Sequence, residues 1–173
     1  MIKIAIALLF TYTLNAQESI TLSVAQDVKM AFKGVSKIDS DPALNMLFQV
    51  RLEARQDKLG FFSLVLGHEY AELTPVYKRN SVDIGYTFNR LFIDNIELGA
   101  YVGLGNINRF SENLPSFGFG GDINYVIGDL KLGFFLQCVQ RSDLGFRYEK
   151  KSPYIFSGFL KVTYVLFRPR SRK

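Results

Sequence analysis

The chain contains a single histidine, His68, which limits the acid–base chemistry that it could perform. A serine hydrolase needs a serine hydroxyl within hydrogen-bond reach of a general base, and no serine follows His68 by one or two positions. Ser63 and Ser81 are candidate nucleophiles only by default. A lone histidine also excludes a metal site built on a histidine pair. We therefore predict no catalytic residue and no metal site, and keep a hydrolytic His68 as the alternative.

Two further features resemble functional motifs but lack what those motifs require. The glycine-rich run from Gly118 to Gly121 is not followed by Lys-Ser or Lys-Thr and opens no helix, so it does not meet the requirements of a phosphate-binding loop. Cys138 is the only cysteine, which excludes an intramolecular disulfide, and we interpret it as a small apolar packing residue. The sequence therefore predicts no cofactor.

The two ends of the chain differ in composition from the rest. Residues 1–16 resemble a secretory signal peptide: Lys3 is followed by an apolar run over 4–14, and Asn15-Ala16 forms a cleavage site before Gln17. The apolar run is too short to span a bilayer as a helix. Residues 168–173 are strongly basic, and we interpret them as a solvated tail, because no nucleic-acid-binding module precedes them. One domain is expected over residues 17–167.

Beyond residue 19, apolar and polar residues alternate with a period of two, which is typical of β-strands with two different faces. In the clearest block, Phe48 and Val50 share the apolar face, whereas Arg51 and Glu53 share the other. The expected strands are 20–30, 44–55, 61–72, 81–89, 95–104, 116–127, 130–140 and 154–167. The 16 phenylalanines, 9 tyrosines and 14 glycines suit strands and tight turns. The sequence therefore predicts an all-β fold.

The connections between the expected strands alternate in length. The short ones are 56–60, 90–94 and 128–129. The longer and more polar ones are 32–43, 73–80, 105–115 and 141–153. In an up-and-down sheet the short turns and both termini lie at one end, here named the turn end, and the long loops lie at the other, the loop end. Strands of about 9 to 11 residues can cross a membrane, so the pattern predicts an eight-stranded antiparallel up-and-down transmembrane β-barrel.

A sheet in a membrane must close, because an open edge in hydrocarbon leaves backbone N–H and C=O groups without partners. With eight strands the interior is narrow enough for side chains to fill it. The polar faces carry acidic and basic residues in nearly equal number, so their charges can pair across the lumen. The predicted lumen charge network is Asp27, Lys29, Arg51, Glu53, Arg55, Glu69, Asp83, Glu97, Asp122, Lys131 and Lys161. We interpret this network as a plug and not as a channel.

Aromatic residues lie near the ends of the apolar faces, where a membrane interface would be. Girdles of this kind flank the apolar band of membrane barrels. The predicted aromatic girdle is Tyr70, Tyr86, Phe88, Phe117, Tyr125, Tyr154 and Tyr164.

On this pattern the mature chain resembles the small eight-stranded outer-membrane barrels of the OmpA transmembrane-domain and OmpX type. The Asn15-Ala16-Gln17 segment also resembles the cleavage region of secreted proteins of the Bacteroidota. The resemblance implies an outer-membrane location and contact with outer-membrane lipid; we expect a monomer that binds no nucleic acid. Such barrels commonly end on an aromatic residue, whereas Phe167 is followed by six further residues here.

The long loops and the lack of a set of catalytic residues favour a structural or surface-interaction role. In that role the loops contact an extracellular partner. Three alternatives stay open. The barrel could form a narrow pore for small solutes, or act on lipid as some eight-stranded barrels do, in the manner of a lipid A deacylase with His68. It could also be a soluble lipocalin-like lipid binder, in which the apolar face lines a cavity. The period of two does not reveal which face points inward.

Overall fold

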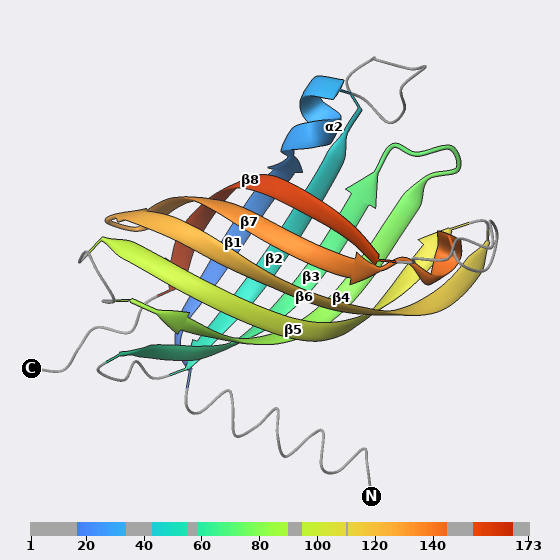
Figure 1. The fold of residues 1–173 in the computed structure, drawn as a ribbon. Helices are drawn as coiled ribbons and strands as arrows, with labels where there is room; N and C mark the ends of the chain where they lie inside the picture. The colour runs from blue at the N-terminus through green and yellow to red at the C-terminus, as the bar shows by residue number, and fades with distance from the viewer. Residues whose placement is uncertain are drawn as a thin grey trace, which may run out of the picture.

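The computed structural model describes residues 17–33, 43–54, 59–89, 95–109, 111–144 and 154–167. Within these ranges, eight strands form a closed antiparallel barrel in sequence order (Figure 1). The strands are β1 (Gln17–Asp27), β2 (Asn45–Ala54), β3 (Gly60–Ala71), β4 (Tyr77–Phe88), β5 (Ile96–Arg109), β6 (Glu112–Ile127), β7 (Leu130–Gln140) and β8 (Tyr154–Phe167). The predicted fold class is confirmed. The expected signal peptide and basic tail lie outside the described residues.

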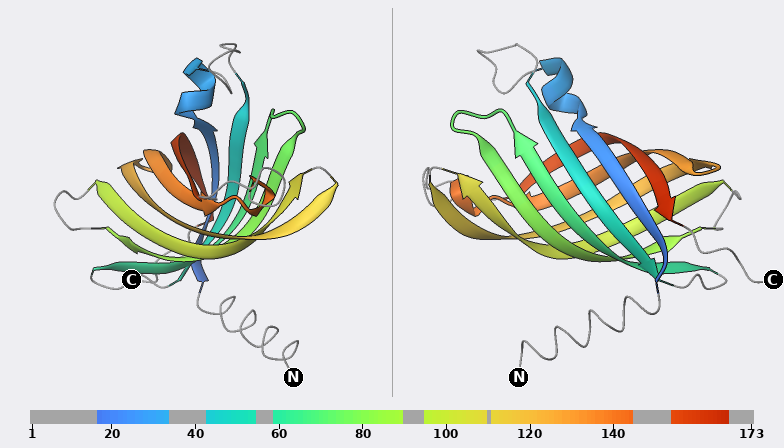
Figure 2. Two further views of the ribbon diagram at one scale, coloured as in Figure 1. Left: turned by 45° about the vertical axis from the view of Figure 1, so that its right-hand side comes forward. Right: turned by 180° about the vertical axis from the view of Figure 1, so that it is seen from behind.

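A short helix, α2 (Val28–Lys33), directly follows β1, and residues 142–144 after β7 are also helical. Seen from behind in Figure 2, α2 stands at the loop end above β1 and β2. None of the described helices is long and apolar enough to cross a membrane.

Pairing between the first and last strands closes the sheet. Val24 and Ala25 of β1 lie opposite Val162 and Lys161 of β8, and each remaining strand pairs with its neighbours in sequence. The start of β1 and the end of β8 lie together at the turn end (Figure 1). No described strand therefore presents an unpaired edge, which is the condition for a sheet surrounded by hydrocarbon.

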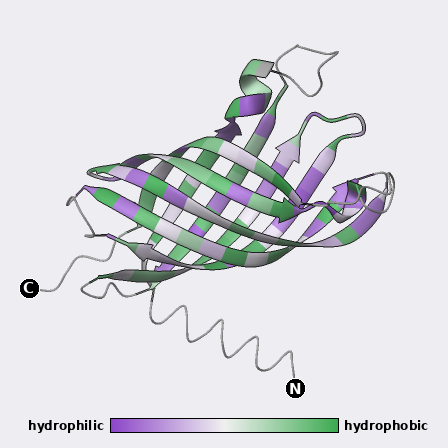
Figure 3. Ribbon diagram, viewed as in Figure 1, coloured by the Kyte–Doolittle hydropathy of each residue, from purple (hydrophilic) through white to green (hydrophobic). Residues whose placement is uncertain are grey.

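Burial along the strands shows which face points inward. Arg51 is 3% exposed, whereas Phe48 on the same strand is 42% exposed; Glu97 is 9% exposed and Leu160 is 59% exposed. Hydrophobic and hydrophilic residues alternate along the strands in Figure 3. The apolar face is therefore the outer wall and the polar face lines the interior, which is opposite to the arrangement of a lipocalin-like barrel.

The interior is not polar throughout. Six buried residues, contributed by β1, β2, β3, β5, β7 and β8, form an apolar cluster inside the barrel: Ala25, Leu47, Val65, Tyr101, Phe135 and Phe159. The ring of Phe135 lies 6.3 Å from that of Tyr101 and 6.3 Å from that of Phe159. The alternation in the sequence places these residues on the inner face but does not show that they would gather into one layer.

The end of β1 differs from the prediction, and Lys29 is therefore not in the lumen. The strand ends at Asp27, whose Oδ1 accepts a 2.9 Å hydrogen bond from the backbone N–H of Met30. This is the usual arrangement of an acidic residue that caps a helix N-terminus. Lys29 lies on α2, where it is exposed, because the chain leaves the sheet before reaching it.

The expected loop over 105–115 is largely a β-hairpin. β5 continues to Arg109 and β6 begins at Glu112, with Asn108 opposite Asn113. The alternation continues through this segment, since Asn106 and Asn108 are exposed whereas Ile107 and Arg109 are buried. Hydropathy predicts a loop over this segment because its outward residues are polar instead of apolar.

The loop end of the barrel has a small apolar core of its own. Ile107 on β5 packs with Ala71 and Tyr77, and all three are at most 1% exposed. Met30 of α2 and Leu73 pack against them. The strands thus continue beyond the expected loop boundaries because their inward residues still bury apolar surface.

Candidate functional site: the charged lumen

A buried ion-pair cluster, here named the central cluster, surrounds Asp122 on β6. Its Oδ2 lies 2.8 Å from Nη2 of Arg51 on β2 and pairs also with Nζ of Lys161 on β8. The Tyr101 hydroxyl donates a 3.1 Å hydrogen bond to the other carboxylate oxygen, and the Arg51 guanidinium lies 4.9 Å from the centre of the Tyr101 ring. Arg51, Asp122 and Lys161 are each at most 5% exposed. The cluster joins three separate parts of the barrel wall with one carboxylate and two cations.

A second group, here named the turn-end cluster, surrounds Lys131 on β7. Its Nζ lies 2.9 Å from Oε2 of Glu97 on β5 and 3.5 Å from Oε1 of Glu53 on β2. Ser19 on β1 donates a hydrogen bond to Glu53. This cluster has one cation and two carboxylates, the reverse of the central cluster. Since Arg51 and Glu53 are alternate residues of one strand, the two clusters are neighbours and their formal charges cancel together.

Glycines leave the space that these long side chains occupy. A Cβ atom on Gly99 would collide with the Asp122 carboxylate and the Tyr101 hydroxyl, and one on Gly133 would collide with the side chain of Asn124. Long side chains from opposite walls therefore meet in the interior, as expected for eight strands.

Beside the apolar cluster lies a small cavity with about 20 Å³ of room for the centre of a water molecule. Gln49, Ser81 and Asp83 line it, and Ser81 donates a 2.9 Å hydrogen bond to Asp83. Oε1 of Gln49 is buried without a hydrogen-bond partner in the described structure. A cavity of this size with polar groups on part of its lining fits an ordered water molecule.

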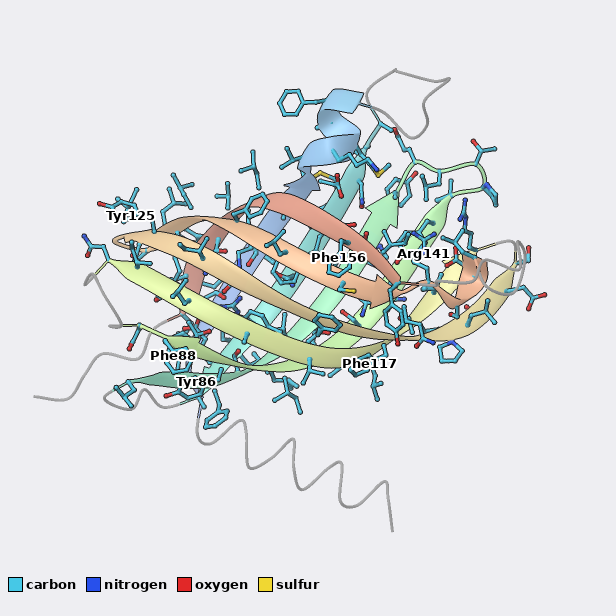
Figure 4. The ribbon with its side chains drawn as sticks, in the orientation of Figure 1. Tyr86, Phe88, Phe117, Tyr125, Arg141 and Phe156 are labelled. Carbon is cyan, nitrogen blue, oxygen red and sulfur yellow. The ribbon has the colours of Figure 1, made fainter. Side chains whose placement is uncertain are left out.

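A third group, here named the mouth cluster, surrounds Asp143 at the loop end. Both carboxylate oxygens of Asp143 accept 2.7 Å hydrogen bonds from Arg141, and Oδ2 lies 3.1 Å from Nη1 of Arg109. The Arg141 guanidinium lies over the Tyr77 ring at 4.0 Å, and Nε of Arg109 donates to the Pro75 carbonyl oxygen. Figure 4 shows Arg141 at this end of the barrel.

The mouth cluster controls the protonation of its carboxylate. Burial alone would raise the pKa of Asp143, but the hydrogen bonds and positive charges of Arg141 and Arg109 outweigh it and lower the pKa below its ordinary value. Asp143 is therefore ionised at neutral pH, and its ion pairs connect the end of β5 with the segment after β7.

The structure brings six of the predicted lumen residues into the central and turn-end clusters. Three others lie apart: Asp27 caps α2, Glu69 accepts a 3.0 Å hydrogen bond from Gln137, and Asp83 pairs with Ser81. Lys29 is outside the lumen, and Arg55 lies outside the described residues.

Sequence reasoning missed four charged residues of the interior and the mouth: Arg79, Arg109, Arg141 and Asp143. Continuing the period of two back from Ser81 and onward from Gly105 would have placed Arg79 and Arg109 on the inner face. Arg141 and Asp143 follow the end of β7, where no strand periodicity applies.

The predicted girdle residues lie at both ends of the outer wall. Tyr86, Phe88 and Tyr125 lie toward the turn end and Phe117 toward the loop end in Figure 4. The Tyr86 ring makes edge-on contacts with Phe62 and Phe88, both at 4.8 Å between ring centres. Strand register places Tyr164 near the turn end and Tyr70 and Tyr154 near the loop end.

His68 and its candidate nucleophiles lie on opposite faces of the sheet. His68 is exposed on the outer wall, with Nδ1 2.7 Å from Oδ1 of Asn80, whereas Ser63 and Ser81 are buried inside at 4% and 8% exposure. The sheet itself therefore separates the base from the hydroxyls. In the described ranges, no group of three or more His, Cys, Asp or Glu residues could hold a metal ion.

A closed eight-stranded barrel with paired charges inside and an apolar outer wall is typical of the class of small eight-stranded membrane-type barrels. The structure is similar to the outer membrane protein Ail of Yersinia pestis, solved in a phospholipid bilayer nanodisc. The TM-score is 0.57, with 12% identity over 86% of this chain and 99% of that chain.

The structure is also similar to Neisserial surface protein A, with a TM-score of 0.50 and 16% identity over 86% of this chain and 95% of that chain. At these identities the likeness shows the fold. No protein-family model matches the sequence, and no curated protein matches it significantly.

Proposed function

We propose that this chain is a monomeric outer-membrane β-barrel with a plugged lumen, which serves a structural or surface-interaction role through its loop end. The observation that carries the proposal is the orientation of the wall. Large apolar side chains such as Val102, Leu104 and Leu160 are 49%, 68% and 59% exposed, whereas charged side chains are buried inside. A soluble monomer rarely exposes so wide an apolar surface, whereas a barrel in a bilayer needs an apolar outer wall.

The plug is supported by how the lumen is filled. The turn-end, central and apolar clusters span the interior, and the mouth cluster lies at its loop end. Each buried charge of the central cluster has a partner of opposite sign, as buried charges require. A conduit for solutes would need these contacts to break.

The surface-interaction role is supported by the shape of the loop end. The β5–β6 hairpin continues past the apolar wall with exposed Asn106 and Asn108, and Phe32 on α2 is 77% exposed. Exposed aromatic and polar side chains at one end of a barrel are typical of contact surfaces.

Membrane fractionation with gel migration tests the barrel and its location. We expect the protein in the outer-membrane fraction, with a faster band in detergent before boiling than after boiling. Recovery from washed cells without detergent, with unshifted migration, would contradict the proposal. In planar bilayers, the wild-type barrel should give no stepwise ion conductance, and a steady open-channel current would contradict the plug.

An epitope inserted after Ser111, at the tip of the β5–β6 hairpin, tests which end faces outward. Antibody should label intact cells carrying this insertion. The matched control carries the same epitope after Asp129, in the β6–β7 turn, and should be labelled only after the cells are permeabilised. The reverse pattern would contradict an extracellular loop end.

A further inference from the structure

Among the described residues, the outer wall changes from apolar to polar toward the loop end of β3 to β6. We name this polar region the amide face; its members on β3 to β6, all exposed except the half-buried Tyr70, are His68, Tyr70, Lys78, Asn80, Asn106, Asn108 and Asn113. Strand register aligns His68, Asn80 and Asn106 in one row, with Tyr70, Lys78, Asn108 and Asn113 in the next row toward the loop end. The row on the turn-end side is Leu66, Val82, Leu104 and Phe117, all exposed. The amide face is therefore continuous with the apolar wall.

The wall over β2 and β8 has no such change. Phe48 on β2 is paired with His68 and is 42% exposed, and Leu44, just before β2, is also 42% exposed. On β8, Phe156 and Tyr154 are 77% and 45% exposed at the loop end. Figure 4 shows Phe156 on this part of the wall. The amide face is thus a local feature and not a rim that surrounds the whole barrel.

Hydrogen bonds hold part of the amide face in place and leave further groups available. His68 Nδ1 lies 2.7 Å from Asn80 Oδ1, and Asn108 donates a 2.9 Å hydrogen bond to Asn113 Oδ1. Among the described residues, Asn80 Nδ2, Asn106 Oδ1 and Asn113 Nδ2 have no partner. Donors and acceptors that project together from a rigid sheet suit the hydroxyl groups of a sugar.

The amide face also has a cation without a neutralising acid. Lys78 is exposed and makes no ion pair within the described part of the chain. Glu72, an acid near this end of β3, accepts a hydrogen bond from the backbone N–H of Leu44 on the neighbouring segment. Tyr70 is opposite Lys78 in the strand register. A lysine beside an aromatic ring and amides suits a phosphate attached to a sugar.

We propose that the amide face binds the phosphorylated sugar headgroup of a glycolipid in the outer leaflet. The acyl chains of the lipid lie against the row from Leu66 to Phe117, while Lys78 contacts its phosphate and the asparagines contact its hydroxyl groups. The inference rests on the proposed outer-membrane placement, because that placement puts this height of the wall at the headgroup layer.

Lipid binding by the folded, full-length mature barrel tests the proposal. The probe is lipid A added to phosphatidylcholine nanodiscs, and binding is measured by native mass spectrometry. We expect Lys78→Gln to weaken lipid A binding about tenfold, as the loss of a charged hydrogen bond predicts. The matched control is Lys29→Gln, which removes the same charge from α2 outside the amide face and should leave binding unchanged. A second variant, Asn106→Ala with Asn108→Ala, should weaken binding without changing the charge.

A comparison of three lipids tests whether the phosphate and the sugar are both recognised. Lipid A should bind more tightly than both its dephosphorylated form and phosphatidylglycerol, which lacks the sugar. Equal binding of all three, or equal losses in Lys29→Gln and Lys78→Gln, would overturn the inference, as would preferential capture of a soluble phosphosugar without its acyl chains. Heat-dependent gel migration of each variant shows that it is folded. If the wild type lacks that shift, the proposed function fails; if the shift is present without lipid A preference, only the amide-face proposal fails.

Discussion

The central cluster and the mouth cluster are both built from one aspartate between two cations, but their residues come from different levels of the fold. Asp122 meets Arg51 and Lys161 across separations of 71 and 39 residues, so these contacts require the closed barrel. Asp143 meets Arg141 only two residues away, and reaches Arg109 across 34 residues. The first cluster therefore depends on barrel closure, whereas much of the second can form locally.

The two clusters also differ in how deeply their side chains are buried. The side chains of Asp122 and Lys161 are at most 1% exposed and lie within strands. The Arg141 side chain is 11% exposed and lies beyond the end of β7, with the Tyr77 ring as a second partner. Loss of an acid should consequently be costly in the middle of the barrel and mild at its mouth, because a stranded cation at the mouth can reach water.

Asp122→Ala is expected to have the largest effect. It leaves the buried Arg51 and Lys161 without their carboxylate, and we expect a loss of about 3–5 kcal/mol in the free energy of unfolding. Urea unfolding in detergent micelles, followed by gel migration, measures this loss. Asp129→Ala, in an exposed turn, is the control and should change stability by no more than about 0.5 kcal/mol. A loss below about 1 kcal/mol in Asp122→Ala would show that the central cluster is not a main source of the stability of the barrel.

Lys131→Met should have the next largest effect, about 2–3 kcal/mol, because it leaves two carboxylates without a cation. The loss is smaller since the side chains of Glu53 and Glu97 are 10% and 12% exposed and retain some hydration. A double-mutant cycle with Glu97→Gln in the same unfolding assay should show positive coupling between the two sites. Strictly additive losses would show that Lys131 and Glu97 do not interact.

Asp143→Asn should reduce global stability by only about 1 kcal/mol, since Arg109 and Arg141 keep other partners. Its main effect should be local: faster hydrogen exchange at residues 141–144 with unchanged exchange in the middle strands. Exchange mass spectrometry of the reconstituted barrel distinguishes the two. Faster exchange throughout all eight strands would show that the mouth cluster stabilises the whole barrel and not only the segment around Asp143.

Acid should break the ion pairs of the mouth cluster, and this should have the smallest effect on stability of the changes considered. Because the pKa of Asp143 is lowered in the folded protein, its ion pairs contribute stability above the ordinary aspartate pKa of about 3.9 and lose it as the pH falls through the lowered value. Protection of residues 141–144, corrected for intrinsic exchange rates, should therefore fall at strongly acidic pH in the wild type. Asp143→Asn should lack this pH dependence, and an identical dependence in both proteins would assign it to another group.

The sequence predicts the middle of the barrel better than its mouth, and the reason is periodicity. Arg51, Asp122 and Lys161 follow a strict alternation against apolar neighbours, so their inner position is readable without coordinates. Asn106 to Arg109 keep the alternation, but both faces contain polar residues there, and hydropathy alone then resembles a loop. Lys29 also fits the period of two, yet the Asp27 cap starts a helix before it.

Partners within the lumen are harder to predict than positions. Which cation meets which carboxylate depends on the stagger of the strands around the closed sheet, and this stagger is not encoded in any one strand. The apolar cluster around Phe135 has the same origin, because its members come from six strands and only closure brings them together.

The most direct test of the central claim, that the apolar wall contacts hydrocarbon, is spin-label accessibility in phospholipid bilayers. In a Cys138→Ser background, labels at Val102 and Leu160 should collide more often with dissolved oxygen than with a water-soluble nickel chelate. A label at Lys29 on α2 should show the opposite preference. Nickel access at Val102 and Leu160 that equals the value at Lys29 would place the wall in water and contradict the account.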